Sequence, residues 1–154
     1  ERPYVTAIRE NGRWTAKGGD EKLREMLSSD SCPAFERMYF EASAEAYEAM
    51  HECIGRGLPL EKLPEFFASE DNPLTAAELA RILMDDCGFS LTEAYRTAAL
   101  CCADVRGAGV DFGELLAVQP RTAHVMSLLR TAFLSHSHSW ETRYLSCRQT
   151  RSPP

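Results

Sequence analysis

Several features typical of large protein classes are missing from this sequence. No apolar run approaches the roughly 18 residues of a membrane span, and the N-terminus has no apolar signal-peptide core. There is no Gly-x-Ser-x-Gly turn, no phosphate-binding glycine loop and no regular internal repeat. We therefore expect no membrane association, no bound cofactor and no catalytic residue that a motif would identify. The chain begins at Glu1 without a methionine, which leaves room for a removed signal or a preceding domain.

The six cysteines also lack the spacings that would give them a special role. None forms a Cys-x-x-Cys pair and none has zinc-ligand spacing. Because a free cysteine behaves as a small hydrophobic residue when it is buried, we expect most of them to be core thiols in a reducing compartment. The sequence therefore predicts a cytoplasmic protein.

The composition indicates one acidic domain. A chain of 154 residues with 44% hydrophobic composition can bury one real core. The net charge of -6 disfavours nucleic acid as a partner, because duplex binding depends on lysine and arginine to neutralise phosphates. The charge is uneven: residues 120–154 carry five arginines against one glutamate, or +4, and the rest of the chain carries -10. We expect the basic end either to fold back or to meet an acidic partner.

Two consecutive helices are predicted at 75–87 and 90–105. Thr75 and Glu78 form the sequence pattern of a capping box, Gly88 ends the first helix, and Ser90 and Glu93 repeat the pattern. The first helix has the apolar stripe Leu79, Ile82 and Leu83, and the second has Leu91, Ala94, Tyr95, Ala98, Cys102 and Val105 on one face. Neither stripe can be buried alone, so the two helices must pack on each other and on further helices. We expect Met38, Ala42 and Ala46 of a long helix and Leu128 and Leu129 of the last helix to cover these stripes.

The predicted fold is mainly α: an irregular or orthogonal bundle of six to seven helices with a short N-terminal β-hairpin. Asn11-Gly12 is a strong signal for that hairpin, because both residues tolerate positive φ. We expect a single compact domain over residues 1–134, with the hairpin at 4–17 and helices over 20–134. Residues 135–154 are expected to form a loosely ordered basic tail or the start of a following segment, in which Trp140 and Tyr144 are unusually apolar.

One row of carboxylates is the clearest candidate for binding. Glu41, Glu45, Glu48 and Glu52 are spaced by 4, 3 and 4 residues and so share one face of a long helix. Such a stripe is either a solvated surface or a docking strip for a basic segment. Together with Trp140 and Tyr144, these glutamates are the partner-binding candidates.

Metal binding has weaker support. Glu48-x-x-His51 has the spacing of a di-metal bundle motif, but such a site needs two of these motifs. His136 and His138 are weak metal candidates, since an extended segment would place both imidazoles on one side. We therefore expect no metal site.

Three functions remain open from the sequence. The first is a non-catalytic protein-interaction or accessory domain, either free or part of a larger multidomain protein, with a protein or a neighbouring domain of the same polypeptide as its partner. The second is an enzyme or enzyme-appended domain that acts on a polar substrate such as a glycan, based only on abundant aromatic and carboxylate residues. The third is a nucleic-acid-binding module that uses helices 75–87 and 90–105, which carry more acidic than basic residues.

Overall fold

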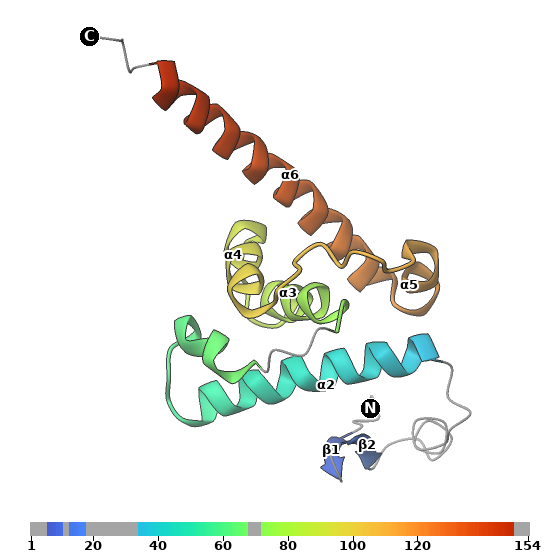
Figure 1. Cartoon of the computed structure of the whole chain (residues 1–154). Coiled ribbons are helices and arrows are strands. Elements are labelled where there is room, and N and C mark those ends of the chain that lie inside the picture. Colours follow the sequence, from blue (N-terminus) through green and yellow to red (C-terminus); the bar gives the residue numbers. More distant parts are fainter. Residues whose placement is uncertain (1–5, 11–12, 18–33, 68–71, 150–154) are drawn as a thin grey trace.

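A computed structural model describes residues 6–10, 13–17, 34–67 and 72–149, with side chains described for 34–67 and 72–135. Within these ranges the chain is mainly helical, which confirms the predicted class (Figure 1). None of the described helices has both the length and the apolarity needed to cross a membrane. The helix expected after Asp20 lies outside the described residues. The described helices are α2 (Ala34–Gly55), the 3-10 helix η1 (Leu60–Phe66), α3 (Thr75–Asp85), α4 (Leu91–Cys101), α5 (Phe112–Val118) and α6 (Pro120–Gln149).

The two described strands, β1 (Thr6–Glu10) and β2 (Arg13–Lys17), pair antiparallel, with Ile8 opposite Thr15. The first two residues of the predicted hairpin, Tyr4 and Val5, lie outside the described residues. How this hairpin lies against the helices stays a prediction.

Helix α3 occupies the centre of the bundle. It packs against α2 on one side and against α4 and α6 on the other (Figure 1). Leu79, Ile82 and Leu83 of α3 are at most 1% exposed, so its apolar stripe is fully buried, as predicted. The partners predicted for this stripe are also buried, namely Ala42 and Ala46 of α2, Tyr95 and Ala98 of α4, and Leu129 of α6. Further members of the predicted core lie half-buried at its margin: Met38, Leu91, Cys102 and Leu128.

The turn between α3 and α4 follows the sequence signals. Gly88 has a φ of 72°, a conformation that glycine adopts without steric cost. The Ser90 hydroxyl accepts the Glu93 N–H at 3.2 Å, and the Glu93 carboxylate accepts the Ser90 N–H at 3.0 Å, which confirms the capping box. Helix α4 ends at Cys101, earlier than predicted, because Cys102 is already extended.

The predicted cap at the start of α3 is wrong. Thr75 lies inside the first turn, and its buried Oγ1 has no hydrogen-bond partner among the described residues. The N-cap is Leu74, and the Asn72 Oδ1 accepts the N–H of this residue at 3.0 Å. The side-chain amide nitrogen of Asn72 donates to the Met38 carbonyl of α2 at 2.9 Å. Asn72 thus links the start of α3 to α2. Because the start of α3 has no capping box, the Glu78 side chain makes other contacts.

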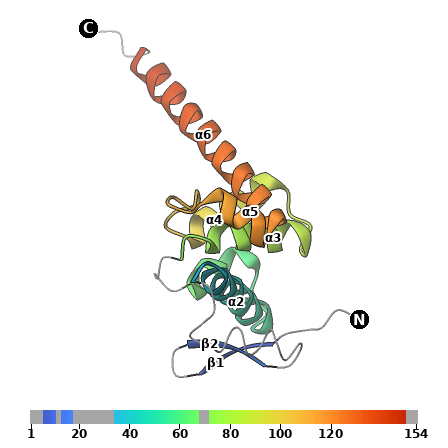
Figure 2. The same cartoon turned by 90° about the vertical axis from the view of Figure 1, so that its right-hand side faces the viewer.

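Helix α6 is longer than the sequence indicates. Its apolar periodicity stops near Ser135, but the helix continues to Gln149. Both views show its C-terminal half projecting away from the other helices (Figures 1 and 2). We call residues 136–149 the arm; at 1.5 Å per residue it is about 21 Å long. The predicted domain boundary at residue 134 coincides with the base of this arm and stays a prediction.

Candidate functional site

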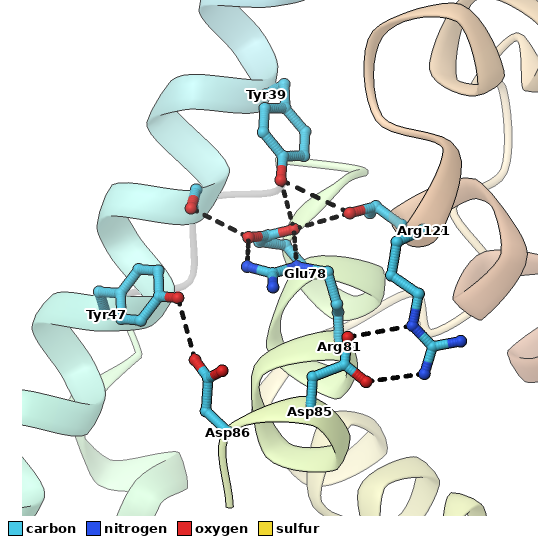
Figure 3. A network of polar contacts seen from close by, with 9 residues as sticks. Tyr39, Tyr47, Glu78, Arg81, Asp85, Asp86 and Arg121 are labelled. Carbon is cyan, nitrogen blue, oxygen red and sulfur yellow. Dashed lines mark hydrogen bonds and ion pairs between the residues drawn. The ribbon is translucent and has the colours of Figure 1, made fainter. Parts of the chain in front are cut away.

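The largest polar cluster of the described bundle surrounds the carboxylate of Glu78, which is completely buried. This Glu78 network consists of Glu78 and Arg81 from α3, Tyr39 and Ser43 from α2, and Thr122 from α6. Figure 3 shows the side chains converging on one carboxylate. The Tyr39, Ser43 and Thr122 hydroxyls donate to it at 2.8, 3.0 and 3.0 Å, and Arg81 donates to both of its oxygens. Three helices are therefore joined through a single side chain.

The charge of Glu78 is stabilised by these donors. Burial by itself raises the pKa of a carboxyl group, but here the hydrogen bonds and positive charge of Arg81, with the hydroxyls of Tyr39 and Thr122, bring the pKa of Glu78 below its ordinary value. Burial, and then the nearby Glu78 charge, raise the pKa of Tyr39. Glu78 is therefore an anion and Tyr39 a neutral donor near neutral pH. Such a pair supplies structural bonding rather than proton transfer.

Two further polar contacts flank the Glu78 network at the C-terminal end of α3 (Figure 3). Arg121 of α6 donates to both oxygens of Asp85 at 3.0 and 2.7 Å, and this interaction lowers the pKa of Asp85. The Tyr47 hydroxyl of α2 donates to Asp86 at 3.1 Å. Each of these carboxylates already has a partner within the domain. Their role is to hold α2 and α6 against α3.

Two of the described thiols have pKa values above the ordinary value of a cysteine. Burial raises the pKa of Cys101 to about 12, and burial also raises the pKa of Cys87. Cys53 is buried and its thiol donates to the Pro59 carbonyl at 3.3 Å. All four cysteines with described side chains are free thiols. Cys101 and Cys87 are thus protonated near neutral pH, and Cys53 belongs to the buried core.

A compact loop between α4 and α5 contacts α6 near the base of the arm. We call residues 104–109 the collar. Arg130 of α6 donates to the carbonyl oxygens of Arg106 and Gly107 at 2.9 and 3.2 Å. The Arg106 guanidinium in turn lies 4.5 Å from the centre of the Phe133 ring. The collar thus connects the base of the arm to the α4–α5 side of the bundle.

The glutamate stripe is on α2, as predicted, but its charge is partly neutralised. The Glu41 carboxylate lies 3.5 Å from the Nε atom of Arg37, and the Glu52 carboxylate lies 3.0 Å from a guanidinium nitrogen of Arg56. Glu41 and Glu45 are half-buried, whereas Glu48 and Glu52 are exposed. Exposed ion pairs of this kind contribute at most about 1 kcal/mol each. The stripe is therefore a mixed-charge helix surface, and its role as a docking strip stays a prediction.

The remaining candidates are placed only by their backbone. Trp140 and Tyr144 belong to the arm, and so do His136 and His138. The two histidines are thus in a helix and not in the extended segment that motivated a metal site, and residues two apart on a helix do not face each other. Within residues 34–67 and 72–135, no three histidine, cysteine, aspartate or glutamate side chains are grouped closely enough to hold a metal ion.

Sequence reasoning missed the Glu78 network and the collar. The first was hidden because Glu78 fits the capping pattern, and its contacts come from residues 39 and 44 positions away in the chain. Asp104, Gly107 and Gly109 gave a signal for a tight loop, but nothing in the sequence shows that this loop meets α6.

Comparisons of this chain with protein-family models, with curated proteins and with solved structures gave no match.

Proposed function

We propose that this chain is a non-catalytic protein-interaction or accessory domain that contacts its partner through the arm. The partner is another protein or a neighbouring domain of the same polypeptide. One observation carries this proposal: the C-terminal half of α6 projects from an otherwise packed bundle (Figures 1 and 2). Leu134, at its base, is 67% exposed.

The composition of the arm supports a role in contacts. A solitary helix of about 12 to 15 residues is marginal in water even with the best helix formers. The arm contains three serines, two histidines and one threonine, which are poorer helix formers than alanine or leucine. It also contains Trp140 and Tyr144, which are four residues apart and therefore share one face of a helix. A partner that covers this face would stabilise the helix.

Catalysis has weaker support. A general acid for glycan cleavage needs a carboxyl pKa raised toward neutrality, whereas the pKa values of Glu78, Asp85 and Asp104 are all lowered. A thiol nucleophile needs a lowered pKa, whereas that of Cys101 is raised. The enzyme alternative therefore rests on sequence composition alone.

Nucleic-acid binding by α3 and α4 also has little support. The residues that would face bases lie at the start of the second helix, and there the Glu93 carboxylate is a helix cap. Arg96 is the one basic side chain on α4. A gel-shift titration at about 50 mM salt tests this alternative, and the absence of retardation would remove it.

Two finer proposals accompany the interaction role. We place the domain in the cytoplasm, because Cys53 is a buried thiol that donates a hydrogen bond and so requires the reduced form. We also expect the hairpin β1–β2 to lie on the outside of the bundle, since two strands alone are marginal in water.

Site-specific photo-crosslinking tests the interaction role. A photoreactive phenylalanine analogue replaces Trp140 or Tyr144 in the arm, and His51 on the exposed face of α2 serves as the matched control. We expect one polypeptide to be crosslinked from both arm positions and not from His51, and a synthetic peptide of residues 130–149 to compete for it. Identical adducts from all three positions, or none from the arm, would contradict the proposal.

A further inference from the structure

The collar holds α6 where the helix leaves the bundle. Two kinds of interaction connect the collar to α6, one made by a side chain of the helix and one made by a side chain of the loop. The Arg130 side chain of the helix reaches the backbone carbonyls of the loop at Arg106 and Gly107. The Arg106 side chain of the loop covers the Phe133 ring of the helix. The contact therefore uses one arginine side chain from each of the two elements.

The collar is also held by hydrogen bonds within the loop. The Asp104 carboxylate accepts the N–H groups of Arg106 and Ala108 at 2.9 and 2.7 Å, which folds the loop on itself. Gly107 has a φ of 63°. A Cβ at this position would lie 2.6 Å from the Met126 methyl carbon and 2.9 Å from the Pro73 carbonyl oxygen. The backbone of the loop thus lies directly on α6 and on the turn that precedes α3.

We propose that the collar is a positioning device that fixes the direction in which the arm leaves the bundle, with Arg130 and Arg106 as its positioning residues. Direction matters for an element of this length. A rotation of about 20° at the collar would move the end of a 21 Å arm by about 7 Å, more than one helical turn. An arm that is already aligned also loses less freedom when a partner binds.

This inference rests on the proposed function in one respect, because that function gives the arm a partner to bind. The role of the collar is tested without reference to any partner. The competing explanation is that the continuous backbone of α6 sets the direction of the arm without help from the collar. The two explanations differ in what happens when Arg130 loses its hydrogen bonds while the backbone of α6 is unchanged.

Residual dipolar couplings of backbone N–H groups in the full chain measure this direction. In the wild type, we expect the couplings of residues 136–149 to fit the alignment tensor of α2 and α3. In Arg130→Met, which keeps the apolar stem but has no donor, we expect the arm couplings to fall about twofold relative to those of the bundle, because the arm then samples several directions. In Arg130→Lys, which keeps a donor, the arm couplings should be closer to those of the wild type. The control is Arg56→Met, which removes a guanidinium 5.3 Å from the Phe66 ring on η1.

Each outcome decides one proposal. Two results would overturn the collar proposal: arm couplings in Arg130→Met that fit as well as in the wild type, or arm couplings that are already averaged in the wild type. The binding role of the arm would then still be decided by the crosslinking experiment. Failed crosslinking together with the expected couplings would contradict the binding role alone. If Arg130→Met does not fold, Arg106→Ala replaces it, because that side chain is half exposed and leaves the buried core intact.

Discussion

Glu78 shows how one residue can define the packing of three helices. A carboxylate that is completely buried is costly unless its charge and its lone pairs are satisfied. Here the arginine comes from the same helix, three residues away, and the three hydroxyls come from the two neighbouring helices. A rotation of α2 would remove the Tyr39 and Ser43 donors from the carboxylate, and a rotation of α6 would remove the Thr122 donor. The Glu78 network therefore selects one relative arrangement of these helices.

We predict that Glu78→Gln destabilises the domain and reduces its sensitivity to acid. Loss of one partner of a buried ion pair costs about 3 to 5 kcal/mol, and the lower end applies here because Arg81 has some access to water. The folded-state pKa of Glu78 is lowered, so its contribution is fully present above the ordinary carboxyl pKa of 4.5. That contribution is lost as the pH falls through the lower folded-state value.

Urea denaturation from pH 7 to pH 3 provides the measurement. The wild type should lose stability below about pH 4.5, and Glu78→Gln should show a smaller slope there. Glu48→Gln is the matched control, because Glu48 is exposed on α2. Equal slopes for wild type and Glu78→Gln would show that Glu78 is not the buried anion described here.

A second prediction at the residue scale concerns Gly107. Both Gly107 and Gly109 have positive φ, but only at Gly107 would an added Cβ meet other atoms, those of Met126 and Pro73. The strain of positive φ is common to both substitutions, whereas overpacking costs a further 1 to 3 kcal/mol or so. Gly107→Ala should therefore be less stable than Gly109→Ala by about that amount. Thermal unfolding compares them, and equal midpoints would contradict the close approach of the collar to α6.

At the scale of elements, the helix starts at Leu74, Ser90 and Asp111 divide into two kinds. Ser90 and Asp111 are exposed caps whose side chains accept the N–H of the third helical residue. The start of α3 is instead buried: the Asn72 side chain accepts the N–H of the N-cap residue Leu74, and the Asn72 carbonyl accepts the N–H of Thr75. A local sequence pattern describes an exposed helix start well, because local contacts dominate there. At a buried start, contacts from other helices decide which side chain turns inward.

We predict correspondingly different effects of substitution at these starts. Ser90→Ala and Asn72→Ala should each cost about 0.5 to 2 kcal/mol, because each removes an acceptor from a helix N-terminus. Thr75→Val should be neutral or stabilising, because the buried Oγ1 has no partner among the described residues and valine has nearly the same shape. Chemical denaturation of the three variants measures this order. A cost for Thr75→Val as large as that for Ser90→Ala would restore Thr75 as the cap.

At the scale of the whole molecule, the bundle and the arm differ in how they are stabilised. The buried core involves α2, η1, α3, α4, α5 and the first half of α6. In both views the arm lies apart from these elements (Figures 1 and 2). The bundle should therefore fold without the arm.

We predict that a chain ending after Ser135 unfolds cooperatively, with a thermal midpoint within about 4 °C of the full chain, a change of under about 1 kcal/mol. It should also lose any partner bound through the arm. Calorimetry of the two chains is the measurement. A large loss of stability, or of cooperativity, would mean that residues beyond 135 are part of the folded core.

The sequence by itself determined the helical class, the position of the α3–α4 turn and most of the core. These depend on local signals: apolar spacing places Leu79, Ile82 and Leu83 on one face, and the Ser90–Glu93 capping box needs only residues three positions apart. An apolar stripe is unfavourable in water and must pack against another apolar surface. Its burial can therefore be predicted from the spacing of its residues alone.

Only the tertiary structure decided the role of Glu78, the function of Asn72, the collar and the direction of the arm. Each depends on contacts between residues far apart in the chain, such as Tyr39 with Glu78 and Arg106 with Arg130. A glutamate in the first turn of a helix can complete a local cap when water surrounds it. Glu78 instead accepts hydrogen bonds from Arg81 and from three hydroxyls, because other helices surround it. Which partners it finds is a property of the packed helices, because only their arrangement removes water from that carboxylate.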